Sequence, residues 1–235
     1  MPRLAQAAAV LLLLAGCASQ PVPVPPPATP HSAGLGMALK VRVSGLASYR
    51  ADGAFFVRRC AADAGAACTE RLVASNYGKD GRLYLLNAEP GEYRAVAAAF
   101  RSGAPGDRSL YFAYFPAAMR EAATVRVDPG QFAYAGSYRL AASIGLCPGQ
   151  AEPAQLQYAE MLEPGTPKCG FFKTLLHKLA TGDYLFIGGT AYPVGTQTFH
   201  YRGTGFEKST EPAEAREFRN AARRDLGGAG WVIGE

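Results

Sequence analysis

Between residues 40 and 141 the chain consists of short runs in which apolar and polar residues alternate or apolar residues predominate. Lys40-Val41-Arg42-Val43 shows the alternation expected of a strand with one buried face. Gly78-Lys79-Asp80-Gly81 predicts a hairpin, and Pro90-Gly91 and Pro129-Gly130 predict type II turns. The strands predicted in this way are 40–43, 55–57, 71–73, 82–86, 92–100, 110–115, 124–127 and 131–141. Such short, closely spaced strands are typical of a β-sandwich or a β-barrel.

The pattern becomes less regular after residue 143. Apolar residues recur at intervals of three and four within 170–180, which predicts an amphipathic helix there. Further strands are expected at 155–161, 184–187 and 196–201, with the last two paired across the glycines between them. The clearest helix is 211–226, because Pro212 suits its first turn, apolar residues recur on one face, and Gly227-Gly228 ends it.

The N-terminus has the features of an export signal. Arg3 supplies a positive charge, an apolar run covers residues 7–14, and small residues precede Cys17. The run is shorter than the roughly 20 residues that a membrane-spanning helix needs. Leu14-Ala15-Gly16-Cys17 resembles the lipobox of bacterial lipoproteins. This resemblance implies that residues 1–16 are a signal peptide, that Cys17 is lipidated, and that Ala18 after it favours the outer membrane. The alternative is an ordinary secretory signal with a cysteine near its cleavage site.

A proline-rich segment follows the cysteine. Residues 17–37 contain six prolines and few large apolar side chains. In a polyproline II conformation, at about 3.1 Å per residue, such a tether would hold the domain up to roughly 60 Å from the bilayer. We expect one globular domain at 38–235 with an elaboration at 143–182. His31 lies in the tether, so we expect no catalytic or ligand role for it.

Net charge and cysteine content limit the classes of partner and cofactor that we expect. The formal net charge of +5 is a mild excess without the concentrated basic stripe typical of nucleic-acid binding, so we expect no nucleic-acid partner. After lipidation of Cys17, four cysteines remain, which predicts two disulfides in an oxidising compartment. Three pairings are possible, and we favour the local one, Cys60 with Cys68 and Cys147 with Cys169. Their spacing does not match a zinc knuckle, and we expect no metal and no cofactor.

Two turn-and-strand segments resemble a known family. Glu89 to Tyr93 and Val127 to Gly136 are similar to segments of bacterial lipoproteins with a prealbumin-like (transthyretin-like) domain. The resemblance covers about Leu39 to Leu140. It implies a fold and no activity: an antiparallel β-sandwich, here with one or two packed helices that include 211–226.

Candidate sites are few. His177 and His200 are the domain's only histidines and fall in a predicted helix and a predicted strand; no G-x-S-x-G motif or paired carboxylate accompanies them, so we expect no enzyme. A dyad of Cys169 and His177 would need an unpaired thiol, and an exported thiol with a partner available should be oxidised. Two groups are candidate interaction surfaces: Arg216, Arg219, Arg223 and Arg224 on the C-terminal helix, and the aromatic run that contains Tyr111 and Tyr114.

Each of these groups has a second interpretation. The four arginines either bind lipid phosphate or an acidic partner, or they simply form a solvated face of the helix. The aromatic run fits either an exposed surface or a strand covered on both faces, for example by the opposing sheet and a helix. We expect a non-enzymatic lipoprotein on the outer membrane, facing the periplasm, that acts as a structural or interaction subunit of an envelope assembly. The alternatives are a module that binds cell-wall glycan or a small ligand and, third, an enzyme.

Overall fold

The computed structural model describes residues 22–43, 47–59, 71–103, 109–144, 180–181, 184–193 and 198–234. Several predictions concern residues wholly or largely outside these ranges: the signal peptide, lipidated Cys17, all four disulfide cysteines, the strand at 155–161, the helix at 170–180 and most of the elaboration at 143–182. None of the helices within the described ranges is long and apolar enough to span a bilayer.

The described chain is mainly β-structure with two α-helices and a short 3₁₀ turn. The first group of elements is β1 (Ala33–Val43), β2 (Ala47–Arg59), β3 (Arg71–Ala74), β4 (Tyr77–Lys79), β5 (Arg82–Ala88), β6 (Gly91–Phe100) and β7 (Leu110–Tyr114). The second is α2 (Ala117–Ala122), β8 (Thr124–Val127), β9 (Phe132–Ile144), β10 (Ala180–Thr181), β11 (Tyr184–Ile187), β12 (Thr190–Pro193), β13 (Thr198–Lys208) and α5 (Pro212–Leu226), with the 3₁₀ turn Gly227–Ala229 last.

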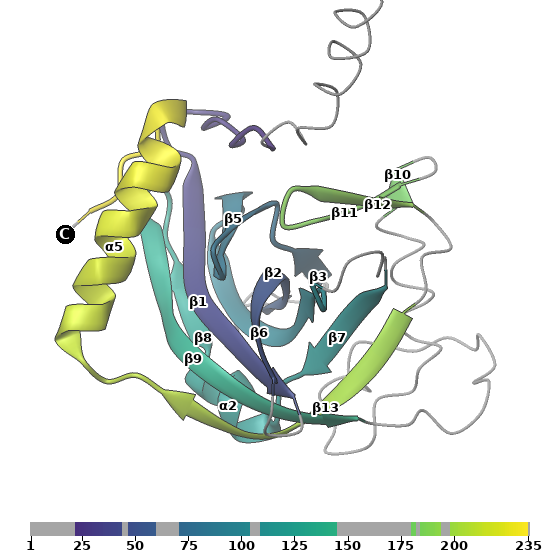
Figure 1. Ribbon diagram of the computed structural model, residues 1–235. Coiled ribbons are helices and arrows are strands. Elements are labelled where there is room, and N and C mark those ends of the chain that lie inside the picture. Colours follow the sequence, from purple (N-terminus) through teal and green to yellow (C-terminus); the bar gives the residue numbers. More distant parts are fainter. Residues whose placement is uncertain are drawn as a thin grey trace, which may run out of the picture.

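Six strands close into a barrel in the order β1-β2-β6-β7-β13-β9, and β9 returns to pair with β1 (Figure 1). Four neighbouring pairs are antiparallel, whereas β1 with β9 and β7 with β13 are parallel. The predicted antiparallel β-sandwich, which the prealbumin resemblance also implied, is therefore wrong. Closure depends on β1, whose first half pairs with β5 and whose second half pairs with β2, so that one strand joins both ends of the sheet.

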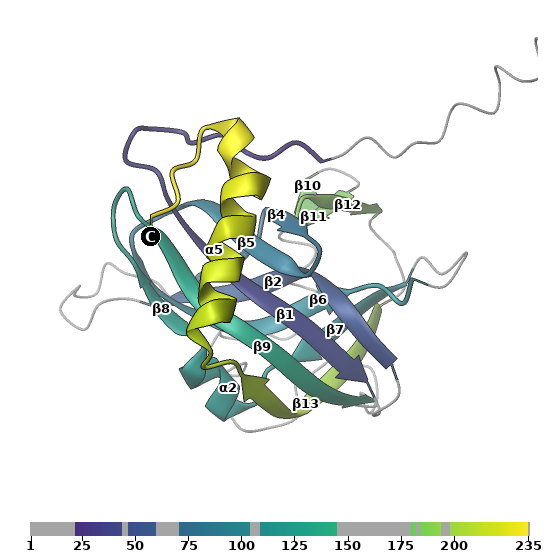
Figure 2. The ribbon, with the colours of Figure 1, turned by 60° about the vertical axis from the view of Figure 1, so that its left-hand side comes forward.

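The barrel interior is the main hydrophobic core. Leu35, Met37, Leu39 and Val41 alternate along β1 and are fully or almost fully buried, as strand periodicity requires of side chains that point inward. Helix α2 lies at one end of the barrel and adds Met119 to this core (Figures 1 and 2). These interior side chains form one hydrophobic cluster among the described residues.

Within the described ranges, the β11–β12 hairpin and α5 pack on the outer surface of the barrel. The β11–β12 hairpin packs on β2, β6 and β7, where Ile187 and Tyr192 join a second apolar cluster. Helix α5 crosses the opposite side of the barrel (Figure 2) and buries Phe218, Ala222 and Leu226 against β1, β5 and β9. The C-terminal helix predicted at 211–226 is thus confirmed to within one residue.

The described part of the proline-rich segment lies on the barrel. Trp231 Nε1 donates a hydrogen bond to the Pro25 carbonyl oxygen at 2.8 Å. Asn87 binds the same segment twice, accepting from the Ala28 amide and donating to the Pro26 carbonyl, each at 2.9 Å. β1 then begins at Ala33, five residues before the expected start of the domain at residue 38. Residues 22–32 therefore add to the folded domain.

Candidate functional site

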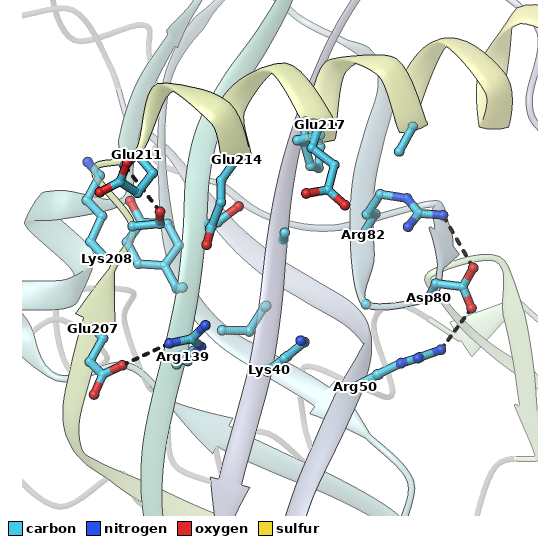
Figure 3. Close-up of a pocket in the computed structure, with 18 of the residues that line it drawn as sticks. Lys40, Arg50, Asp80, Arg82, Arg139, Glu207, Lys208, Glu211, Glu214 and Glu217 are labelled. Carbon is cyan, nitrogen blue, oxygen red and sulfur yellow. Dashed lines mark hydrogen bonds and ion pairs between the residues drawn. The ribbon is translucent and has the colours of Figure 1, made fainter.

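A groove of about 760 Å³ lies between α5 and the barrel. One wall is α5 from Glu214 to Arg224 with the residues before the helix, and the other is the outer face of β1, β2 and β9 (Figure 3). Its floor includes Tyr138 and Phe218. The groove is the place where a helix crosses a curved sheet and its first turns stand away from the strands.

The barrel wall carries a row of three cations. Lys40 on β1 is in register with Arg50 on β2 and with Arg139 on β9, so all three occupy neighbouring positions on adjacent strands. All three are exposed, because they alternate with inward-facing residues such as Leu39. Like charges directly opposite one another on a sheet destabilise it. We call Arg139, Lys40 and Arg50 the cationic row.

Acidic residues neutralise only the ends of this row. Arg139 pairs with Glu207 at 3.5 Å, and Arg50 pairs with Asp80 at 3.1 Å (Figure 3). These exposed pairs are weak, in the range of about 0–1 kcal/mol. Within the described ranges, Lys40 at the centre has no ion-pair partner. The row therefore keeps a positive charge at its middle that a bound anion would neutralise.

The helix wall carries the opposite charge. Glu214 and Glu217 are three residues apart on α5, which puts them on one helix face, and both extend toward the strands (Figure 3). Glu211, just before the helix, also lines the groove. Among the residues that the structure describes, Glu214 and Glu217 form no ion pair. The two walls thus present unneutralised charges of opposite sign across one groove.

A buried carboxylate fixes the other end of α5 to the barrel. The side chain of Asp225 is only 4% exposed and accepts hydrogen bonds from Arg82 Nε at 2.7 Å and from the Tyr84 hydroxyl at 2.9 Å. Lys79 approaches the same carboxylate at 3.3 Å. Desolvation opposes ionisation, but the Arg82 and Tyr84 hydrogen bonds outweigh it and lower the pKa of Asp225 below its ordinary value. Burial beside Asp225 raises the pKa of Tyr84, which keeps its hydroxyl a donor.

The chemistry of the groove suits binding. Its described lining supplies carboxylates, guanidinium groups, ammonium groups and hydroxyls, and contains no histidine or cysteine. In the ranges that the structure describes, no three His, Cys, Asp or Glu side chains are grouped to hold a metal ion. The arrangement can hold a ligand that carries an anionic group for the cationic row and a cationic group for the helix wall.

The four arginines of α5 are not one surface. Only Arg224 lines the groove. Arg223 holds the C-terminal segment, donating from Nε to the Ile233 carbonyl at 3.1 Å and from Nη2 to the Gly234 carbonyl at 3.0 Å. Arg216 is exposed and Arg219 half-buried, outside the residues that line the groove. The structure thus separates Arg224 from the other three.

The aromatic run of β7 is packed on both faces. Tyr111 stacks on Phe100 and on Phe199, with ring centroids 5.5 and 5.2 Å apart, beside the barrel core. Tyr114 packs on the outer cluster beneath the β11–β12 hairpin, where burial raises the pKa of its hydroxyl. The cover on the outer face is this hairpin and not the helix that the sequence led us to expect. Tyr111 and Tyr114 thus serve packing.

The remaining predicted site residues are only partly placed. Cys17, Cys60, Cys68, Cys147, Cys169 and His177 lie outside the described residues, and His200 is placed by its backbone in β13. The groove was missed because its residues come from five separate segments. The sequence does show that Lys40 and Arg139 are polar residues of alternating strands. It does not show which residues of neighbouring strands lie in register.

No family model, curated protein or solved structure matches this chain.

Proposed function

We propose that this chain is a lipoprotein anchored on the outer membrane by lipid on Cys17, and that its barrel domain is a non-enzymatic interaction subunit. The groove beneath α5 is the binding site, and the occupant is a surface segment of an envelope protein. The unneutralised charge of Lys40, at the centre of the cationic row, is the observation that carries this proposal.

The charges of the groove define the partner. An acidic side chain or a chain terminus of the partner would sit at Lys40 and relieve the repulsion from Arg50 and Arg139. A basic side chain of the same segment would face Glu214 and Glu217. Complementary charges of this kind select a partner and reject segments with the opposite arrangement.

Charge reversal at Lys40 separates binding from stability. Lys40→Glu removes repulsion within the row and should leave the free energy of unfolding unchanged or raise it by up to about 1 kcal/mol. The same substitution should lower co-purification of the envelope partner from crosslinked cells by at least roughly tenfold, the loss of about 1.4 kcal/mol in binding. Quantitative mass spectrometry of the lipidated protein and its adducts measures the binding, and chemical denaturation measures the stability.

Arg216→Glu is the matched control. It makes the same change of charge on an exposed residue of α5 that does not line the groove. It should leave the recovered partner unchanged. Equal losses with Lys40→Glu and Arg216→Glu would contradict a site in the groove, because net charge would then explain both.

A small ligand is the second candidate. Opposite walls of charge around about 760 Å³ also fit a zwitterionic molecule, including a cell-wall fragment that carries both an amino and a carboxyl group. Saturable binding of soluble cell-wall fragments, lost in Lys40→Glu and kept in Arg216→Glu, would favour this candidate. Calorimetry with the purified protein is the direct measurement.

A further inference from the structure

A second, apolar groove lies where the described chain begins. It has a volume of about 960 Å³ and is lined at one side by Val22 and Pro23. Phe186 and Ala191, from the β11–β12 hairpin, line it as well. Its other apolar lining residues come from β3 and β5: Leu72, Val73, Ala74, Leu85 and Leu86. The groove therefore joins the N-terminal segment to one end of the barrel.

Large apolar side chains are exposed at this groove. Among the described residues, four large hydrophobic side chains are exposed, and two of them, Val22 at 40% and Phe186 at 49%, line it. Val22 also contacts the hairpin turn, since a Cβ on Gly189 would lie 2.7 Å from its side chain. Exposed apolar side chains that gather beside a groove mark interaction with a partner or a membrane.

The docked proline segment limits how far this groove can be from Cys17. Residues 25–28 are fixed to Trp231 and Asn87, so only the chain before Val22 can act as a spacer. Val22 is five positions after Cys17, with four residues between them, and a fully extended chain covers about 18 Å over that length. Part of this length must cross the lipid headgroups, which occupy roughly 5–8 Å on each side of a bilayer.

We propose that this end of the barrel rests on the lipid bilayer, with Val22 and Phe186 in the headgroup region. The proposal depends on the proposed lipid anchor at Cys17 and gives the domain its orientation. The bilayer is the occupant because the anchor and the short spacer bring the groove to it. Arg71, on the rim with half of its side chain exposed, is already paired with Glu89 at 2.7 Å, so the apolar side chains carry the proposed contact. Helix α2, at the far end of the barrel, then faces away from the membrane (Figures 1 and 2).

Fluorescence quenching tests this orientation. The lipidated full-length protein carries Phe186→Trp and is reconstituted into phosphatidylethanolamine and phosphatidylglycerol vesicles with brominated acyl chains. The native Trp231 is the only other tryptophan, is buried and gives the same background in every variant. Ala118→Trp, on the exposed face of α2, is the control. We expect bromine to quench the added emission of Phe186→Trp at least twofold more than that of Ala118→Trp.

The outcomes separate the orientation from the anchor. Equal quenching of the two added tryptophans in vesicle-bound protein would overturn the orientation and leave the anchor standing. If the wild-type protein binds vesicles no better than Cys17→Ser, the anchor fails and the orientation that depends on it is overturned. Vesicle binding that Cys17→Ser lowers, together with selective quenching of Phe186→Trp in the lipidated protein, would support both the anchor and the orientation.

Discussion

Gly36→Ala should lower the free energy of unfolding by about 2–3 kcal/mol, the cost of overpacking a core. Gly36 lies on the outer face of β1 beneath α5. A Cβ there would be 2.7 Å from Phe218 Cζ, 2.9 Å from Phe132 Cζ and 3.1 Å from Tyr84 Cδ1. These rings also pack on one another, so none can move alone. The strand and the helix must separate, which would also widen the groove and weaken partner binding.

Gly34→Ala is the matched control for this prediction. It makes the same change two residues earlier on the same face, where the nearest atoms would be 3.3 Å from the new Cβ. Its cost should stay below about 1 kcal/mol, within the usual range for a tolerated change. Urea denaturation of the three proteins gives the comparison. Equal losses from the two substitutions would mean that contact with Phe218 does not set the position of α5.

Asp225→Asn should lower the free energy of unfolding by about 2 kcal/mol or more at neutral pH. The substitution removes the negative charge that holds Arg82 and Lys79, and leaves the half-buried Arg82 guanidinium without its closest counter-ion. Asp80→Asn is the control, because Asp80 also pairs with Arg82 but is 54% exposed. Its cost should be under about 1 kcal/mol. Calorimetry or denaturant titration measures both variants.

The loss of stability caused by Asp225→Asn should depend on pH. The pKa of Asp225 is lowered in the folded state from its ordinary value of 3.8, so its carboxylate stabilises the fold above that pH. The contribution is lost as the pH falls through the lower, folded pKa. The difference in stability between wild type and Asp225→Asn should therefore be constant above about pH 5 and shrink below about pH 4. A difference that grows toward acid pH would contradict the ion pair.

Local signals in the sequence predicted many elements. The hairpin at Asp80-Gly81 is confirmed between β4 and β5, with φ values of 53° and 78° at the turn. Most predicted strands match observed ones, and α5 matches to one residue. The largest omission is the first half of β1. Residues 33–37 are buried on both faces, by the barrel core and by α5, so they do not alternate between apolar and polar and fall within the tether predicted at 17–37.

Strand partners could not be predicted in the same way. Alternation shows which side chains of a strand share a face, but not which strand lies beside it. The expected pairing of 184–187 with 196–201 is wrong, because β11 pairs with Thr190–Pro193 and β13 enters the barrel between β7 and β9. The two parallel ladders that distinguish this barrel from a sandwich join segments far apart in the chain.

The candidate site depends on that register. Lys40 and Arg139 are about a hundred residues apart and become neighbours only through the parallel ladder of β1 and β9. The arginines of α5 lie close together in the sequence and were therefore predicted as a surface. Only Arg224 of these lines the groove. The acidic wall has a local signal, since Glu214 and Glu217 share a helix face. These two glutamates indicate a binding site only together with the cationic row on the opposite wall of the groove.

The most direct test of the central claim is photo-crosslinking from inside the groove in intact cells. A photo-reactive amino acid replaces Glu217, which points into the groove, or Arg216, which is exposed beside it. Our account predicts an adduct with one abundant envelope protein from position 217, lost on addition of Lys40→Glu and absent from position 216. No protein adduct from position 217, or the same adducts from both positions, would contradict the groove as a partner-binding site.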